Sequence, residues 1–205
     1  MLNGHGPASK VVVVGGSLGG LFNAIALRSL GYEVDVYEKS SGLMQDRGAG
    51  IVLQGDVNAA PGDELDRVLI DKDGRRREFS VPQGIVSPGM ADWLHGQARR
   101  ILPPTFLRLV EATREPFVQT IHDLAVPKMA FGRVCLSGDA AFVPRPHTAA
   151  STAKAAANAL ALTNCLAVAK GDVVAALRRW EPAQLDYGEQ LRVHGQRLGK
   201  RSQFN

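Results

Sequence analysis

The alternation of apolar and polar positions predicts a strand, a helix and a second strand at the start of the chain. Residues 10–14 (KVVVV) form an apolar, β-branched run, which is typical of a strand buried on both faces of a sheet. Residues 21–30 place apolar side chains at helical spacing, and Gly31 follows as a stop signal. Residues 33–37 (EVDVY) alternate and predict the second strand. This order is that of a βαβ unit with parallel strands.

The middle of the chain predicts short helices followed by strands. Residues 89–101 and 104–113 have helical spacing and are separated by a pair of prolines. Residues 117–126 alternate and predict a strand. Residues 133–137 are a further short apolar strand, which ends at Gly138-Asp139.

The last third of the chain is predicted to be helical. Residues 151–169 are rich in alanine, the strongest helix former, and Ser151 or Thr152 is a candidate N-cap. Residues 172–197 predict another helix, broken or kinked near Pro182.

Composition narrows the class of protein. The chain has 205 residues, of which 45% are hydrophobic and 21% charged, so we expect a globular protein of one domain or two small ones. No apolar stretch is long enough for a membrane span. Two cysteines are too few for a disulfide scaffold or a zinc site, so we expect a reducing, cytoplasmic location and no metal. The net charge of +4 is mild and does not argue for a nucleic-acid partner.

A glycine-rich turn, GGSLGG, joins the first strand to the first helix. Gly15 permits the sharp turn, and a small residue at Ser17 permits close approach of a pyrophosphate. Gly20 lets the helix pack near the strand, and the N–H groups of the helix start attract phosphate. Glu38 ends the second strand, where an acid accepts hydrogen bonds from ribose hydroxyls and repels a 2′-phosphate. The pattern therefore predicts a site for the ADP part of FAD or NAD, although a βαβ turn without nucleotide is the alternative.

The second motif is Gly138-Asp139-Ala140-Ala141, followed by a proline-bearing loop and a long helix. An aspartate at a strand end can accept a hydrogen bond from a polyol, and the helix start favours negative charge. A flavin needs both, because its ribityl chain carries hydroxyls and its reduced ring is anionic near N1.

Together, GGSLGG, RGAGIVLQ (47–54) and GDAAFVPRPH (138–147) resemble the single-component FAD-dependent aromatic hydroxylases of the para-hydroxybenzoate hydroxylase fold. Within that family they are most similar to the branch that hydroxylates dihydroxypyridines. The resemblance implies an α/β fold with a Rossmann-like FAD-binding domain, a parallel sheet with flanking helices. It also implies that NADPH or NADH acts as the transient reductant and that O2 hydroxylates a small hydroxylated aromatic or N-heteroaromatic ring.

The resemblance also implies positions for the cofactor, though no catalytic acid or base. The ADP half would lie against Gly15, Gly16, Ser17, Leu18, Gly20, Glu38 and Lys39. The flavin and ribityl chain would lie against Arg47, Gly50, Ile51, Asp139, Pro146, Ala149 and Ala150, with His147 a weak candidate for substrate contact. Relatives usually carry glycines in the loop between Pro146 and the following helix, and an aspartate at the position of Asn158.

The chain is shorter than members of this family, and the missing block would fall at about residues 54–63. We therefore expect a discontinuous FAD-binding domain (1–54 and 127–170), a remnant of the substrate domain (55–126) and a C-terminal helical segment (171–205). The leading hypothesis is an FAD-dependent monooxygenase. Apolar faces that the missing block leaves uncovered would favour self-association. The alternatives are a non-catalytic FAD- or nucleotide-binding remnant and an NAD-dependent oxidoreductase.

Overall fold

The computed structural model describes residues 9–40 and 67–202. The chain divides into two compact units. Unit 1 comprises Met1–Leu53 and His122–Asn205, and unit 2 comprises Gln54–Ile121. Arg47, Gly50 and Ile51, and the position of the expected missing block, lie outside the described residues.

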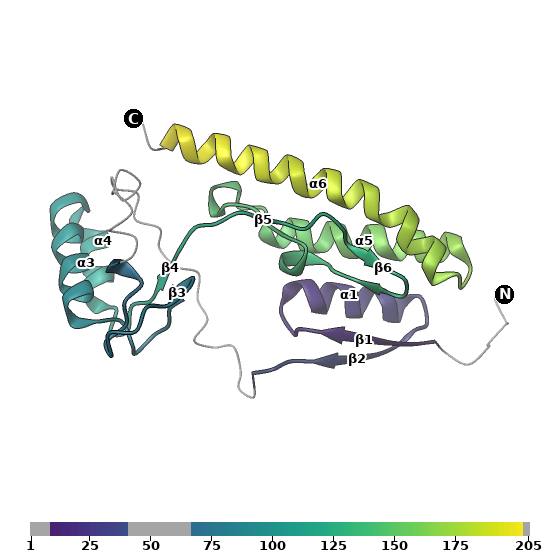
Figure 1. Cartoon of the computed structure of the whole chain (residues 1–205), viewed down its shortest axis with the longest axis horizontal. Helices are drawn as coiled ribbons and strands as arrows, with labels where there is room; N and C mark the ends of the chain where they lie inside the picture. Colours follow the sequence, from purple (N-terminus) through teal and green to yellow (C-terminus); the bar gives the residue numbers. More distant parts are fainter. Residues whose placement is uncertain (1–8, 41–66, 203–205) are drawn as a thin grey trace. The chain divides into compact units, whose positions relative to one another are not determined.

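Unit 1 begins with the predicted βαβ unit. Strand β1 (Lys10–Val14) pairs in parallel with β2 (Glu33–Tyr37), and α1 (Leu18–Ser29) connects them (Figure 1). Gly31 ends the connection at φ +88°, a conformation that favours glycine, as its stop signal predicts. The strands and the helix predicted from the hydrophobic pattern are confirmed.

The three long helices of unit 1 pack in succession on this strand pair. Helix α1 packs against α5 (Ser151–Ala169), which in turn packs against α6 (Val173–Ser202) (Figure 1). Leu27, Leu162 and Trp180 are buried in the core that the helices share. Val11 and Val13 of β1 pack against that core from the sheet side.

The other face of the strand pair is open, so the prediction of a strand buried on both faces is wrong. Val12 is 55% exposed and Val14 is 85% exposed. Among the described residues every sheet has two strands, so the fold is mixed α/β, and the larger Rossmann-like parallel sheet is not seen. A continuous apolar strand sequence needs cover on both faces, but the covering elements come from elsewhere in the chain.

The remaining strands of unit 1 are short and antiparallel. Strand β5 (Leu124–Ala125) pairs with β8 (Phe142–Val143), and β6 (Ala130–Phe131) pairs with β7 (Val134–Cys135). The strand expected over 133–137 is therefore shorter than predicted and belongs to a hairpin. Gly132, at φ +64°, supplies the positive φ that a two-residue hairpin loop needs.

Unit 2 contains the two predicted helices, α3 (Pro88–Ile101) and α4 (Pro104–Ala112). The Ser87 hydroxyl accepts from the Met90 N–H at 3.3 Å and caps α3, and Pro88 occupies its first turn. Strand β3 (Ser80–Val81) pairs antiparallel with β4 (Val118–Gln119). The single strand expected over 117–126 is wrong, because β4 and β5 are separate strands in different units.

A buried carboxylate organises the turn of unit 2 that its Asp-Lys-Asp-Gly sequence signals. Asp71 is 1% exposed and accepts from the N–H groups of Asp73 and Arg75 at 3.0 and 2.9 Å. Its other oxygen accepts from the Arg77 guanidinium at 2.8 Å. The Arg75 N–H leads the interactions that lower the pKa of Asp71, which outweigh the opposing effect of burial.

Helices α5 and α6 refine two further predictions. Helix α5 has the predicted bounds, but its N-cap is Ala150 and no side chain caps it, so capping by Ser151 or Thr152 is wrong. Helix α6 continues through Pro182 instead of breaking there. Tertiary contacts hold α6 in place beside the proline. The Glu181 carboxylate accepts hydrogen bonds from the N–H groups of Met129 and Ala130, both at 2.7 Å. No helix in the described part of the chain is long and apolar enough to span a membrane.

Candidate functional site

The glycine turn between β1 and α1 has the geometry that its sequence predicts. The Gly15 N–H donates to the Tyr37 carbonyl at 2.7 Å, and Gly15 has φ +105°. A Cβ on Gly20 would lie 1.8 Å from the Gly15 carbonyl oxygen, so this position excludes every other residue. The backbone here is therefore compact enough to leave its outer side open to a ligand.

Glu38 closes this turn from the end of β2. Its carboxylate accepts from the Gly16 N–H at 2.8 Å and from the Ser40 N–H at 2.9 Å. These bonds fix the orientation of the carboxylate. Lys39, the neighbouring predicted residue, is exposed.

The start of α1 has no side-chain cap among the residues that the structure describes. Ser17 is the N-cap in an extended conformation, and its side chain makes no capping hydrogen bond. Ser17 and Leu18 are exposed, and no acidic residue lies in the first helical turn. An uncapped helix start with a positive dipole end is a favourable place for a phosphate.

The second motif forms a short 3-10 turn, η3 (Gly138–Ala140), held from behind by α5. Gly138 is at φ +64°, and its N–H donates to the Asn158 side-chain oxygen at 3.1 Å. The Asn158 amide nitrogen donates to the Gln184 oxygen at 2.7 Å. Asn158 is fully buried, and the amide serves as both acceptor and donor, a pairing that an ionised aspartate would not supply.

The fold brings the two motifs into contact. A Cβ on Gly19 would lie 3.9 Å from the Gly138 Cα, so the glycine turn and η3 are neighbours. The Asn23 amide nitrogen donates to the Gly19 carbonyl at 2.8 Å and to the Ser137 hydroxyl at 3.2 Å, which ties the motifs together. The Asn23 side-chain oxygen is buried without a hydrogen-bond partner, which is uncommon for a buried amide.

Asp139 projects from η3 and is paired with a buried lysine. The Asp139 side chain is 72% exposed, whereas that of Lys154 is 0% exposed, and the two form an ion pair. The Lys154 ammonium also donates to the Phe142 carbonyl at 2.6 Å and lies 5.0 Å from the centre of the Phe142 ring. Asp139 thus presents its carboxylate to solvent on a fixed support.

The loop before α5 contains the other described predicted residues. Pro146 begins a 3-10 turn, η4 (Pro146–Thr148), and Ala149 follows in the left-handed region at φ +49°. The Ala150 N–H donates to the Thr148 hydroxyl at 3.2 Å. The side chain of His147 lies outside the described part of the structure, so its weak substrate prediction stays a prediction.

Replacing Ala149 with glycine is expected to stabilise the protein by about 1 kcal/mol. An L-residue in the left-handed region costs roughly 1–2 kcal/mol, and glycine removes this cost while losing roughly 0.5–1 kcal/mol more entropy on folding, which leaves the net gain. The free energy of unfolding from urea denaturation would measure the change. Ala150→Gly is the matched control, since Ala150 has a right-handed conformation (φ −93°) and glycine there should destabilise. Equal losses at both positions would contradict the expectation.

The sequence-based site prediction did not include three important residues: Asn23, Lys154 and Asn158. Asn158 has a structural linking role. A signal for the last two exists in α5. Lys154 and Asn158 continue, at four-residue spacing, the buried stripe of Leu162 and Leu166. A polar side chain on the core face of a helix must find partners, so such positions identify buried networks.

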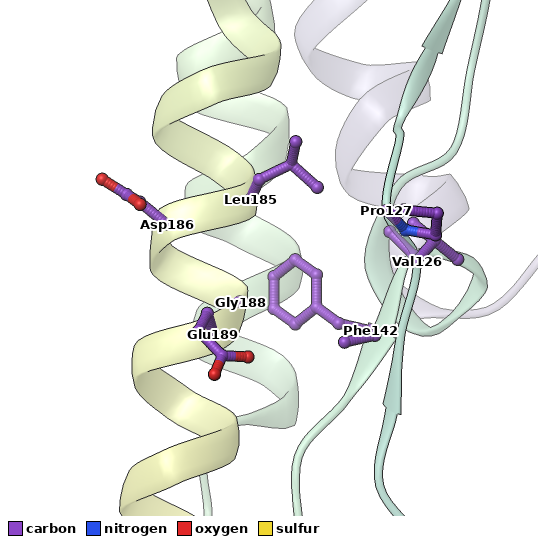
Figure 2. Close-up of a pocket in the computed structure, with 9 residues that line it drawn as sticks. Val126, Pro127, Phe142, Leu185, Asp186, Gly188 and Glu189 are labelled. Carbon is purple, nitrogen blue, oxygen red and sulfur yellow. The ribbon is translucent and has the colours of Figure 1, made fainter.

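A pocket of about 280 Å³ lies in unit 1 between α6 and the segments that contain Val126 and Phe142 (Figure 2). The Phe142 ring projects toward α6, and Leu185 and Glu189 lie on the helix side. A Cβ on Gly188 would lie 2.7 Å from the ring, which explains the glycine at this helix position. None of the predicted cofactor residues lines the pocket.

Together the glycine turn, the acid ending β2, the uncapped start of α1 and the exposed Asp139 define a dinucleotide-binding class of protein. The residues fit an ADP-containing cofactor, because the glycine turn allows a close backbone approach that a Cβ at Gly20 would block.

Comparison with known proteins specifies the class further. A family model described as FAD binding domain-like matches residues 45–123, which is less than half of the chain. The chain is 37% identical over 131 residues to 2,6-dihydroxypyridine 3-monooxygenase of Paenarthrobacter nicotinovorans; the match covers 64% of this chain and 32% of that enzyme. The chain thus spans about a third of the length of the curated relative that it matches.

Solved structures share the fold. 2,6-Dihydroxypyridine-3-hydroxylase from Arthrobacter nicotinovorans matches with a TM-score of 0.81 and 20% identity, over 97% of this chain and 94% of that one. Klebsiella pneumoniae HpxO, solved with FAD and uric acid, gives a TM-score of 0.65 at 16% identity and covers 96% and 89%. The tetracycline destructase Tet(51) gives 0.62 at 13% identity and covers 98% and 93%.

These matches confirm the resemblance to the FAD-dependent aromatic hydroxylases. The chain is similar to 2,6-dihydroxypyridine 3-monooxygenase, and its shorter length fits an internally shortened relative. The family description names FAD, in agreement with the cofactor expected from the sequence.

Proposed function

We propose that this chain binds FAD and hydroxylates a small hydroxylated aromatic or N-heteroaromatic ring with NAD(P)H and O2. The observation that carries the proposal is the contact between the glycine turn and η3 through Gly19 and Gly138. This contact supports the proposal, because the turn proposed to bind phosphate and the acceptor carboxylate of Asp139 would then lie side by side, as a flavin dinucleotide requires. An NAD-dependent oxidoreductase needs no polyol acceptor at Asp139, so the contact favours a flavin.

The described residues would act mainly by binding and orienting the cofactor. N–H groups at the start of α1 would face the pyrophosphate, and Glu38 would accept from the ribose hydroxyls. Asp139 would accept from the ribityl chain, and the loop through Pro146, Ala149 and Ala150 would lie along the ring system. When bound, FAD supplies the redox and oxygen chemistry, and the protein's part is to position the ring and exclude water.

A second candidate is a protein that binds FAD without hydroxylating anything. It is favoured by the length of the chain, which spans about a third of the curated monooxygenase that it matches. Much of a substrate pocket would then be missing. The cytoplasmic location, the choice between NADPH and NADH, and self-association through the open face of β1 also remain proposals.

Titration of the purified protein with FAD tests the binding step. We expect the flavin absorbance between about 350 and 500 nm to comigrate with the protein on gel filtration, because the motifs proposed to bind both halves of the cofactor are present in the sequence. NADPH oxidation and formation of a hydroxylated product are then measured with 2,6-dihydroxypyridine. Product formation supports the monooxygenase. Bound flavin that yields no hydroxylated product supports the second candidate, and failure to bind excess FAD contradicts both.

A further inference from the structure

The environment of Lys154 is suited to holding the exposed carboxylate of Asp139 in position. Its side chain is 0% exposed, which is uncommon for lysine, and it lies one turn into α5. The ammonium is directed at one Asp139 oxygen, Oδ1, and at the Phe142 carbonyl. The Phe142 ring face, 5.0 Å away, borders its remaining side.

These contacts give Asp139 a defined orientation. Among the described residues, the Asp139 side chain accepts its only hydrogen bond from Lys154, at Oδ1, so Oδ2 stays open to solvent. An exposed aspartate without such a support samples several rotamers and loses that freedom when a ligand binds. Lys154 removes this cost beforehand, and it keeps the carboxylate an acceptor beside a positive charge.

The support is anchored at both ends. Lys154 belongs to α5, whose Asn158 holds the Gly138 N–H one turn further along. The Phe142 carbonyl belongs to β8, which follows η3 in the chain. One helix face therefore holds the strand end, the 3-10 turn and the carboxylate in a single arrangement.

We propose that Lys154 is a positioning residue for cofactor binding: it holds Asp139 so that Oδ2 accepts from the flavin's ribityl hydroxyls. This inference rests on the proposed FAD-binding function and adds a residue that does not itself touch the cofactor. Because it acts through Asp139, its effect on FAD affinity should disappear when Asp139 loses its carboxylate.

The test is a double-mutant cycle on the dissociation constant of FAD, measured by quenching of flavin fluorescence with the full chain. Lys154→Met is expected to raise the constant about tenfold, and Asp139→Asn by a similar factor. The double variant should bind no worse than Asp139→Asn alone. Lys170→Met is the matched control, since it removes an exposed lysine at the other end of the same helix and should bind like the wild type.

Each outcome has a defined meaning. Wild-type affinity in Lys154→Met, or multiplied losses in the double variant, overturns the positioning role while leaving FAD binding intact. No FAD binding by the wild type overturns the proposed function and this inference together. Circular dichroism at the assay temperature checks that each variant is folded. A purely structural role of Lys154 would lower the melting temperature without changing the dissociation constant of the folded protein. If Lys154→Met does not fold, Lys154→Gln replaces it with the same expectation.

Discussion

Replacing Gly20 with alanine is expected to lower the free energy of unfolding by at least about 3 kcal/mol and to abolish FAD binding. The added Cβ would lie 1.8 Å from the Gly15 carbonyl oxygen and 3.3 Å from a Val13 methyl group. The overlap is with backbone, which cannot move aside as a flexible side chain can, so α1 must shift away from β1. Urea denaturation and FAD titration measure the two effects.

Gly19→Ala is the matched control for stability, one residue earlier in the same helix. A Cβ there would lie 3.9 Å from the Gly138 Cα and 4.0 Å from the Ala155 Cβ, which is ordinary contact. Alanine is also the better helix former, so we expect a gain of about 0.5 kcal/mol. Similar losses of stability in Gly19→Ala and Gly20→Ala would show that the close approach of Gly20 to Gly15 is not what the turn depends on.

The second large effect is expected from Asp139→Asn, which should lower the free energy of unfolding by about 3 kcal/mol. Lys154 is fully buried, and removing the carboxylate leaves its ammonium without a counter-charge. The reverse change costs much less, because Asp139 is 72% exposed and water can solvate it when Lys154 is absent. Lys154→Met should therefore stay within about 1 kcal/mol of the wild type.

The double variant distinguishes the physical cause. With both charges gone, the stability of Asp139→Asn should return to that of Lys154→Met alone, because no buried charge remains unpaired. Trp180 is 1% exposed and reports unfolding of unit 1 by its fluorescence. An Asp139→Asn variant as stable as the wild type, or a double variant less stable than either single one, would contradict this account.

Much of the local structure could be predicted from the sequence. The pattern of apolar residues was sufficient for β1, β2, α3 and α4, and the alanine content was sufficient for α5, because each prediction depends on the residues of a single segment. The strand over 117–126 was predicted wrongly, because alternation in a short segment does not show which neighbours will pair with it. β4 and β5 find partners in different units, so the segment divides.

The candidate site shows the same division. Gly15 and Gly20 were predicted correctly as a tight turn, because the reason for glycine there is a clash within one short segment. The roles of Asn23 and Lys154 were not predicted, because their partners lie 114 and 15 residues away in sequence. A lysine among alanines is ordinarily a solvated residue, and only packing of α5 against η3 makes it a buried one.

By itself, the sequence of this protein determined the βαβ start, the glycine turn, the acid at Glu38 and the resemblance to FAD-dependent aromatic hydroxylases. The structural features among these depend on backbone sterics and on hydrogen bonds between residues that are close in sequence. Only the tertiary structure decided that β1 is covered on one face, that Gly19 meets Gly138 and that Lys154 supports Asp139. Those outcomes depend on which segments, distant in sequence, pack together and exclude water, so they are properties of the folded chain.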